Sequence, residues 1–153
     1  MLRAPWSEFD FEDMTWSIPA ARRKTRRQHN EPHVVPLHPF HIRILDEIRI
    51  INGHPVWLFP HQSGSEPRKA DALRQATSRF CIRNDIPSFS PRDLRRTFKT
   101  LSGALGLSLE IRNRIQGHAM SDVGSVYYDR YEYLQEKRIA LTSWSQWLIE
   151  QTK

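Results

Sequence analysis

The apolar pattern of the sequence changes its period near Pro39, and this change limits the chain to a mixed fold. Before Pro39, apolar and polar residues alternate over residues 6–11 and 14–18, and prolines keep residues 32–37 extended. After Pro39, apolar residues recur at intervals of three and four, which is typical of helices. We therefore expect an α+β fold, mostly helical, with a small N-terminal antiparallel sheet.

Five helices are expected after the sheet, over residues 39–52, 70–83, 91–105, 109–116 and about 122–150. Gly53, Gly106 and Gly117 stop three of them. Ser90, Pro91 and Asp93 form an N-terminal cap for the third. A buried connector over residues 56–59 and a polar loop over residues 61–69 join the first two helices. The apolar residues expected on the inner faces are Phe40, Ile44, Ile48 and Ile51, then Leu73, Ala76, Phe80 and Ile82, then Leu94, Phe98, Leu101 and Leu105, and finally Leu134, Leu141, Trp144 and Leu148.

The charge balance favours a polyanionic partner. Among the 153 residues, 23 are Lys or Arg and 17 are Asp or Glu, and the isoelectric point is about 9.9. Basic side chains release counterions when they neutralise phosphates, so nucleic acid is the favoured partner class. A net charge of +6 is also compatible with a basic face that only keeps the chain soluble.

The cysteine count and the hydropathy pattern indicate a cytoplasmic protein. Cys81 is the single cysteine, so no internal disulfide can form, and its apolar neighbours Phe80 and Ile82 favour a core position over a nucleophilic one. No Cys/His spacing resembles a zinc site. No apolar run reaches the roughly 20 residues of a membrane span, and no signal peptide is recognisable. One domain without a membrane partner, metal or cofactor is therefore expected.

Residues 89–138 carry basic, histidine and tyrosine side chains in a distinctive order. Arg95 lies in FSPRDLRRTFKTL, and Gly117 and His118 lie in IRNRIQGHAM. Tyr127 and Tyr128 follow His118 by nine and ten residues, at the start of YYDRYEYLQEKR. Each short motif is weak by itself, but their combination is specific.

This combination resembles the catalytic core of the tyrosine recombinases, the phage-integrase type of enzyme. The likeness extends upstream to TWSIPAARRKTRRQHNEPHVVPL and so covers nearly the whole chain. It implies a catalytic domain of tyrosine-recombinase type that cuts and rejoins DNA through a covalent 3′-phosphotyrosine. The link preserves the energy of the phosphodiester, so neither ATP nor metal is required.

The resemblance assigns five catalytic candidates. Arg95 and His118 would stabilise charge on the phosphate oxygens, because guanidinium forks and imidazole donors suit that task. Tyr128 would attack phosphorus, Lys24 would protonate the leaving oxygen, and Arg92 would contact phosphate. Further DNA contacts are expected from basic residues on the turn before the third strand and on the third helix: Arg22, Arg23, Arg26, Arg27 and Arg96.

Several assignments keep an alternative. Tyr127 can replace Tyr128 as the nucleophile, but the two side chains point about 100° apart on a helix, so one alone can face the phosphate. Without its context, His118 is an ordinary helix-stop residue, and the run at residues 22–27 is a solvated turn. Arg96 fits a structural role as well as a phosphate contact. The last helix either packs in its own core or docks on a neighbouring subunit, as in similar enzymes.

Two departures from the family pattern affect the expected activity. Arg92 stands where the family has histidine, and arginine cannot act as a base near neutral pH. Another catalytic arginine of the family, upstream of the stretch matching residues 2–6, and the N-terminal DNA-binding domain are expected to be absent. Residues 1–153 are thus interpreted as a partial catalytic domain, homo-oligomeric on double-stranded DNA and encoded by a bacterium or phage. The alternatives are an inactive DNA-binding remnant of this fold and an interaction protein that does not bind DNA.

Overall fold

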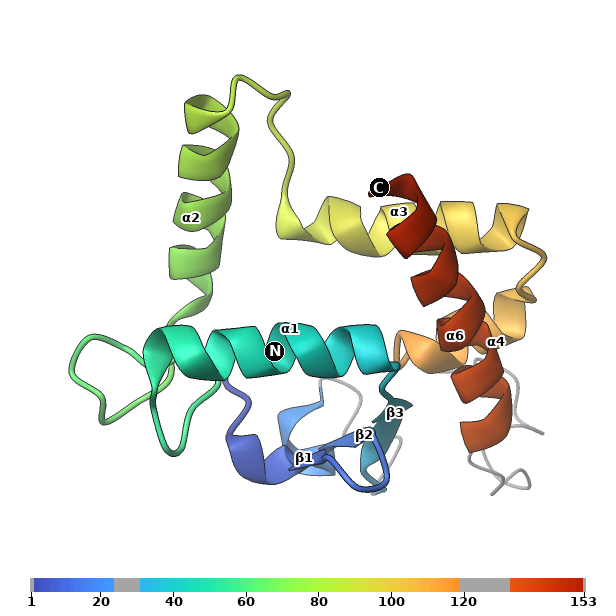
Figure 1. Ribbon diagram of the computed structural model, residues 1–153, viewed down its shortest axis with the longest axis horizontal. Coiled ribbons are helices and arrows are strands. Elements are labelled where there is room, and N and C mark those ends of the chain that lie inside the picture. The colour runs from blue at the N-terminus through green and yellow to red at the C-terminus, as the bar shows by residue number, and fades with distance from the viewer. Residues whose placement is uncertain (1, 24–30, 119–132, 153) are drawn as a thin grey trace.

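The structure is a computed structural model that describes residues 2–23, 31–118 and 133–152. This part of the chain contains a small antiparallel sheet followed by five α-helices (Figure 1). The expected α+β, mostly helical fold is confirmed. None of the helices in the described ranges is both long and apolar enough to span a bilayer.

The sheet has three antiparallel strands in the order β1-β2-β3. Its strands are β1 (Phe9–Asp10), β2 (Thr15–Ile18) and β3 (His33–Pro36), with Trp16 opposite both Phe9 and Val35. The short helix η2 (Ala20–Arg22) follows β2. The prediction of a strand over residues 6–8 was wrong, because Trp6–Glu8 form the 3-10 helix η1. There the backbone N–H of Trp6 donates to Val56 O (2.8 Å) and its indole donates to His54 O (2.9 Å), so this stretch pairs with a distant loop.

The first four helices begin and end close to the predicted positions, whereas the last begins at Leu134, after the left-handed Tyr133 (φ +53°). They are α1 (Pro39–Asn52), α2 (Ala70–Arg83), α3 (Pro91–Ala104), α4 (Leu109–Ile115) and α6 (Leu134–Gln151). Gly53 ends α1 with a φ of +57°, a left-handed conformation that glycine adopts without strain. The polar loop at residues 61–69 is confirmed. The predicted helix over residues 122–132 lies outside the described residues.

The main core lies between α1 and the sheet. Its buried members come from the N-terminal segment, the sheet, α1 and the connector after α1: Ala4, Trp6, Phe9, Leu37, Leu45 and Leu58. On α1 the buried stripe runs through Ile42, Leu45 and Ile48, whereas Ile51 is 83% exposed. The predicted stripe was therefore partly wrong. Polar residues complete the inner face, since Arg49 stacks on the Trp6 ring at 4.5 Å and Asn52 donates to Leu58 O at 2.9 Å.

The inner face of α2 was also predicted wrongly. Leu73, Phe80 and Ile82 are exposed, whereas Cys81 is buried, as expected for a core cysteine. On α3, Leu94 is 60% exposed and the serine Ser102 is fully buried. Figure 1 shows α2 standing steeply away from α1 and joined to α3 by an extended loop. The apolar side chains Leu73, Phe80 and Ile82 of α2 therefore face solvent in this arrangement.

The last helix packs within its own chain. Leu141 and Trp144 are buried, and the Trp144 ring meets Phe98 of α3 edge-on at 5.1 Å. Lys137 is buried and donates from Nζ to Val34 O of β3 at 2.7 Å. Helix α6 thereby joins β3 to α3 and α4, as Figure 1 shows at the right of the molecule.

Candidate functional site

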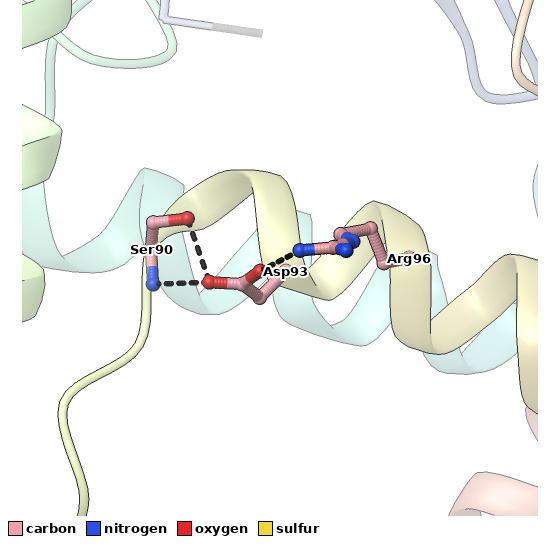
Figure 2. A network of polar contacts seen from close by, with 3 residues as sticks. All are labelled: Ser90, Asp93 and Arg96. Atoms are coloured by element: carbon pink, nitrogen blue, oxygen red, sulfur yellow. Dashed lines mark hydrogen bonds and ion pairs between the residues drawn. The ribbon is translucent and has the colours of Figure 1, made fainter.

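The site begins at the N-terminus of α3, which a capping interaction holds in place. The Asp93 Oδ2 accepts from the backbone N–H of Ser90 (2.9 Å) and from its hydroxyl (2.7 Å). Figure 2 shows this network, in which Arg96 lies 3.4 Å from the other carboxylate oxygen. These hydrogen bonds, first the one from the Ser90 N–H, lower the pKa of Asp93. The predicted cap is confirmed, and it fixes the residue at which α3 begins.

Four basic residues follow one another along a single face of α3. Their positions increase by three, one and three, so they lie within about 100° of one another around the helix. We call this set the basic stripe: Arg92, Arg95, Arg96 and Lys99. Arg92 and Arg96 are exposed, as a phosphate contact requires. Lys99 is an addition to the predicted residues, and the helical spacing could have revealed it.

Helix α4 ends in a Schellman motif, which explains the Gly-His pair. The N–H of Gly117 donates to Arg114 O (3.1 Å) and the N–H of His118 donates to Asn113 O (3.0 Å). This geometry needs a left-handed residue at Gly117, whose φ is +64°. A residue directly after such a glycine has a fixed backbone, and here that residue is His118.

Arg95 and His118, far apart in sequence, meet at the end of α4. The Arg95 Nη2 lies 3.1 Å from His118 Nε2 and donates to Gln116 O at 2.9 Å. The Gln116 side chain donates in return to Arg95 O at 2.8 Å. A guanidinium at a helix C-terminus also compensates the negative end of the helix dipole. The contact between two predicted site residues is therefore supported by a reciprocal clamp.

The contacts of His118 define its protonation in the absence of a ligand. Because Arg95 can only donate, Nε2 of His118 accepts, and Nδ1 carries the hydrogen and faces Asn113 Oδ1 at 3.4 Å. Partial burial of the ring, then the charges of Arg95 and Lys99, lower the pKa of His118. The imidazole is consequently neutral at pH 7, and an anion placed beside it would favour its protonated form.

A second histidine approaches the same turn from the sheet. His33 on β3 donates from Nε2 to Ile115 O at 3.0 Å, and its ring lies beside Gly117, where a Cβ would be 3.4 Å away. Burial lowers the pKa of His33 to about 4, with smaller contributions from the charges of Lys137, Arg23 and Arg95 and against the opposing hydrogen bond to Ile115. Positive charges from three elements therefore converge near this ring.

The predicted DNA contacts near β2 have different environments. Arg22 pairs with Glu8 at 2.9 Å and donates to the Arg3 carbonyl, so its charge is compensated. Arg23 donates to Glu31 O at 3.1 Å and joins the two sides of the β2–β3 connection. Their contact with DNA stays a prediction. The remaining predicted residues lie outside the described part of the chain: Lys24, Arg26, Arg27, Tyr127 and Tyr128.

The arrangement is suited to holding an oxyanion. Arg95 has a planar fork of donors, and His118 has a ring nitrogen beside it that becomes a donor on protonation. Arg92, Arg96 and Lys99 add positive charge on the same helix. Within the described residues, no group of three or more His, Cys, Asp or Glu side chains could hold a metal ion.

Comparison with known proteins gives distant relatives of one kind. The chain is 26% identical to the prophage integrase IntA of Escherichia coli (strain K12) over 143 residues, which cover 93% of this chain and 33% of that protein. It is 25% identical to the integrase of Enterobacteria phage P4 over 159 residues, covering 95% and 35%. The prophage integrase IntZ of Escherichia coli (strain K12) is 26% identical over 141 residues, covering 92% and 33%. The chain thus spans about a third of the length of these relatives. No protein-family model matches it, and neither does any solved structure.

Proposed function

We propose that this chain, a distant relative of the phage and prophage integrases, is the part of a tyrosine recombinase that breaks and rejoins DNA strands at specific sites. The contact between Arg95 Nη2 and His118 Nε2 at 3.1 Å carries the proposal. Two residues 23 positions apart in the sequence meet there on an exposed basic surface, and the sequence places Tyr127 and Tyr128 nine and ten residues after His118.

In the proposed reaction, the scissile phosphate sits against Arg95 and His118. Arg95 turns part of its fork from His118 to the non-bridging oxygens, and the phosphate charge favours the imidazolium form of His118. Both groups then donate to oxygens whose negative charge grows as phosphorus is attacked. Arg92 adds a further positive charge at the start of the same helix.

The nucleophile of the proposed reaction is Tyr128, with Tyr127 as its competitor. The tyrosine hydroxyl releases its proton to solvent as its oxygen forms a bond to phosphorus, and the bond from phosphorus to the 5′ oxygen breaks. Lys24 gives a proton to that leaving oxygen, which departs as a 5′ hydroxyl. Attack by another 5′ hydroxyl on the phosphotyrosine reverses these steps and joins the strands.

Covalent trapping tests this function. The 153-residue chain is incubated with a pool of nicked DNA duplexes, in which the short cleaved fragment diffuses away and the enzyme stays attached to the DNA. We expect an adduct that survives denaturation and is lost in Tyr128→Phe. Tyr127→Phe is the matched control and keeps the adduct.

Two other outcomes would contradict parts of the proposal. An adduct that persists in Tyr128→Phe and disappears in Tyr127→Phe would move the nucleophile by one residue. A complex that forms only at low salt, without an adduct, would indicate a DNA-binding remnant, because phosphate contacts alone weaken steeply with salt.

A further inference from the structure

The C-terminal carbonyls of α4 are divided between the backbone and two side chains from elsewhere. The Schellman motif uses Asn113 O and Arg114 O. Arg95 of α3 donates to Gln116 O, and His33 of β3 donates to Ile115 O. The last carbonyls of a helix need such external donors. The turn that carries His118 is therefore held from two sides, by α3 and by the sheet.

His33 is suited to this place because it is a neutral donor. Its neighbours Arg23, Arg95 and Lys137 are positively charged, so a cationic side chain at this position would repel Arg95. The ring also packs against Gly117, where a Cβ would meet it at 3.4 Å in ordinary van der Waals contact. One side chain thereby supplies a hydrogen bond and a flat packing surface to the turn.

We infer that His33 is a positioning residue: it holds the C-terminal turn of α4 against β3 and so sets where His118 lies relative to Arg95. This inference rests on the proposed function, in which Arg95 and His118 bind one phosphate. His33 itself lies behind the turn and contacts neither the Arg95 fork nor the His118 ring in the hydrogen bonds of the described residues. Its effect on cleavage is therefore transmitted through the backbone of residues 115–118.

Two amide substitutions separate the hydrogen bond from mere polarity. His33→Gln places an amide nitrogen at about the reach of Nε2, so it can still donate to Ile115 O. His33→Asn carries the same amide on a side chain one methylene shorter, which cannot reach. If His33→Asn does not fold, His33→Met keeps the length of Gln without a donor and takes its place. His41→Gln serves as the control, because His41 is also half-buried but contacts Ser145 of α6 at 3.4 Å.

The first readout is the ring of His118 in the full chain, observed by ¹H–¹⁵N NMR without DNA. In the native chain we expect the hydrogen on Nδ1 and a pKa below the ordinary value. His33→Gln and His41→Gln should keep both features. In His33→Asn, the preference for Nδ1–H should weaken and the pKa should rise toward the ordinary value, since Arg95 no longer faces the ring.

The second readout is the rate of adduct formation on nicked DNA at saturating DNA. A displacement of about 1 Å in a reacting group lowers rates by roughly a hundredfold, so we expect a decrease of ten- to a hundredfold in His33→Asn with unchanged DNA affinity. A folded His33→Asn chain with the native His118 spectrum would overturn the inference. If the native chain forms no adduct, the proposed function fails, and the His118 spectrum alone still decides the role of His33.

Discussion

Acid should destabilise this protein through His33, and the effect can be isolated with one substitution. Burial, with the nearby charges of Lys137, Arg23 and Arg95, lowers the pKa of His33 from 6.5 to about 4 in the folded chain. In the unfolded chain the ring returns to its ordinary value. Between these two values the unfolded state binds more protons than the folded state, so stability rises with pH.

The size of the effect follows from the size of the pKa change. One pKa unit corresponds to about 1.4 kcal/mol, so His33 accounts for about 3 kcal/mol of unfolding free energy. This amount is fully present above pH 6.5 and is lost as the pH falls to about 4. Below that value the loss ends, because the folded state is then protonated too. Against a total stability of about 5–15 kcal/mol, the change is easily measured.

The assay is urea unfolding at several pH values between 7.5 and 4, followed by fluorescence of the five tryptophans. His33→Gln keeps the donor to Ile115 O but does not titrate, so it should lose about 3 kcal/mol less than the native chain over this range. His41 and His118, whose pKa values are also lowered, contribute equally to both proteins and cancel in the comparison. Equal losses in the two proteins would refute the assignment to His33.

Three further substitutions test the packing around the site. Gly117→Ala should destabilise the chain by about 1–2 kcal/mol in thermal unfolding, because its φ of +64° is strained for any residue with a Cβ; an unchanged melting temperature would contradict this. Gly103→Ala should lower the unfolding free energy by no more than about 1 kcal/mol, since the new Cβ, 2.7 Å from Arg112 Nη1, would displace this flexible side chain from Lys99 O while alanine favours the helix. In the Arg112→Ala background, Gly103→Ala should instead raise the unfolding free energy by about 0.5–1 kcal/mol, because alanine favours the helix. If Gly103→Ala has the same effect in both backgrounds, a double-mutant cycle would exclude the contact between residue 103 and Arg112. Trp144→Ala should cost about 3–5 kcal/mol in urea unfolding by removing the edge-on packing on Phe98, and a loss below about 1 kcal/mol would show that the helix is held elsewhere.

The predictable parts of the fold were those determined by residues close together in the sequence. Gly53 and Gly117 ended their helices as expected, because a left-handed residue after a helix is a local requirement. The Ser90–Asp93 cap depends on residues three positions apart, so the start of α3 could also be predicted.

The inner faces of the helices were less predictable, because polar residues occupy buried positions. Lys137 is 5% exposed and Ser102 and Ser145 are fully buried, although a pattern of apolar residues assigns all three to solvent. Each is satisfied by a specific partner, as Lys137 is by Val34 O. The partners of Lys137 and Ser145 come from tertiary packing, which the apolar period does not encode, whereas Ser102 donates to Phe98 O of its own helix.

The candidate site was likewise predictable only where its residues form a local sequence motif. Arg95 and His118 were singled out from their motifs, and the structure places them in contact. His33 was not, because its hydrogen bond to Ile115 O joins residues 82 positions apart and follows no local pattern. Gln116 was overlooked for a similar reason, since its clamp with Arg95 exists only when α3 and α4 are packed together.

Vanadate titration of the 153-residue chain, followed on the His118 ring by NMR, tests most directly whether Arg95 and His118 form one phosphate site. Vanadate adopts the geometry of a phosphoryl group under attack, so a site built for that state should bind it. We predict that vanadate binding raises the pKa of His118, that Arg95→Gln abolishes this response, and that Arg43→Gln, which removes an exposed arginine of α1 outside the basic stripe, leaves it intact. A His118 ring that does not respond to vanadate, or that responds equally in Arg95→Gln, would contradict the account.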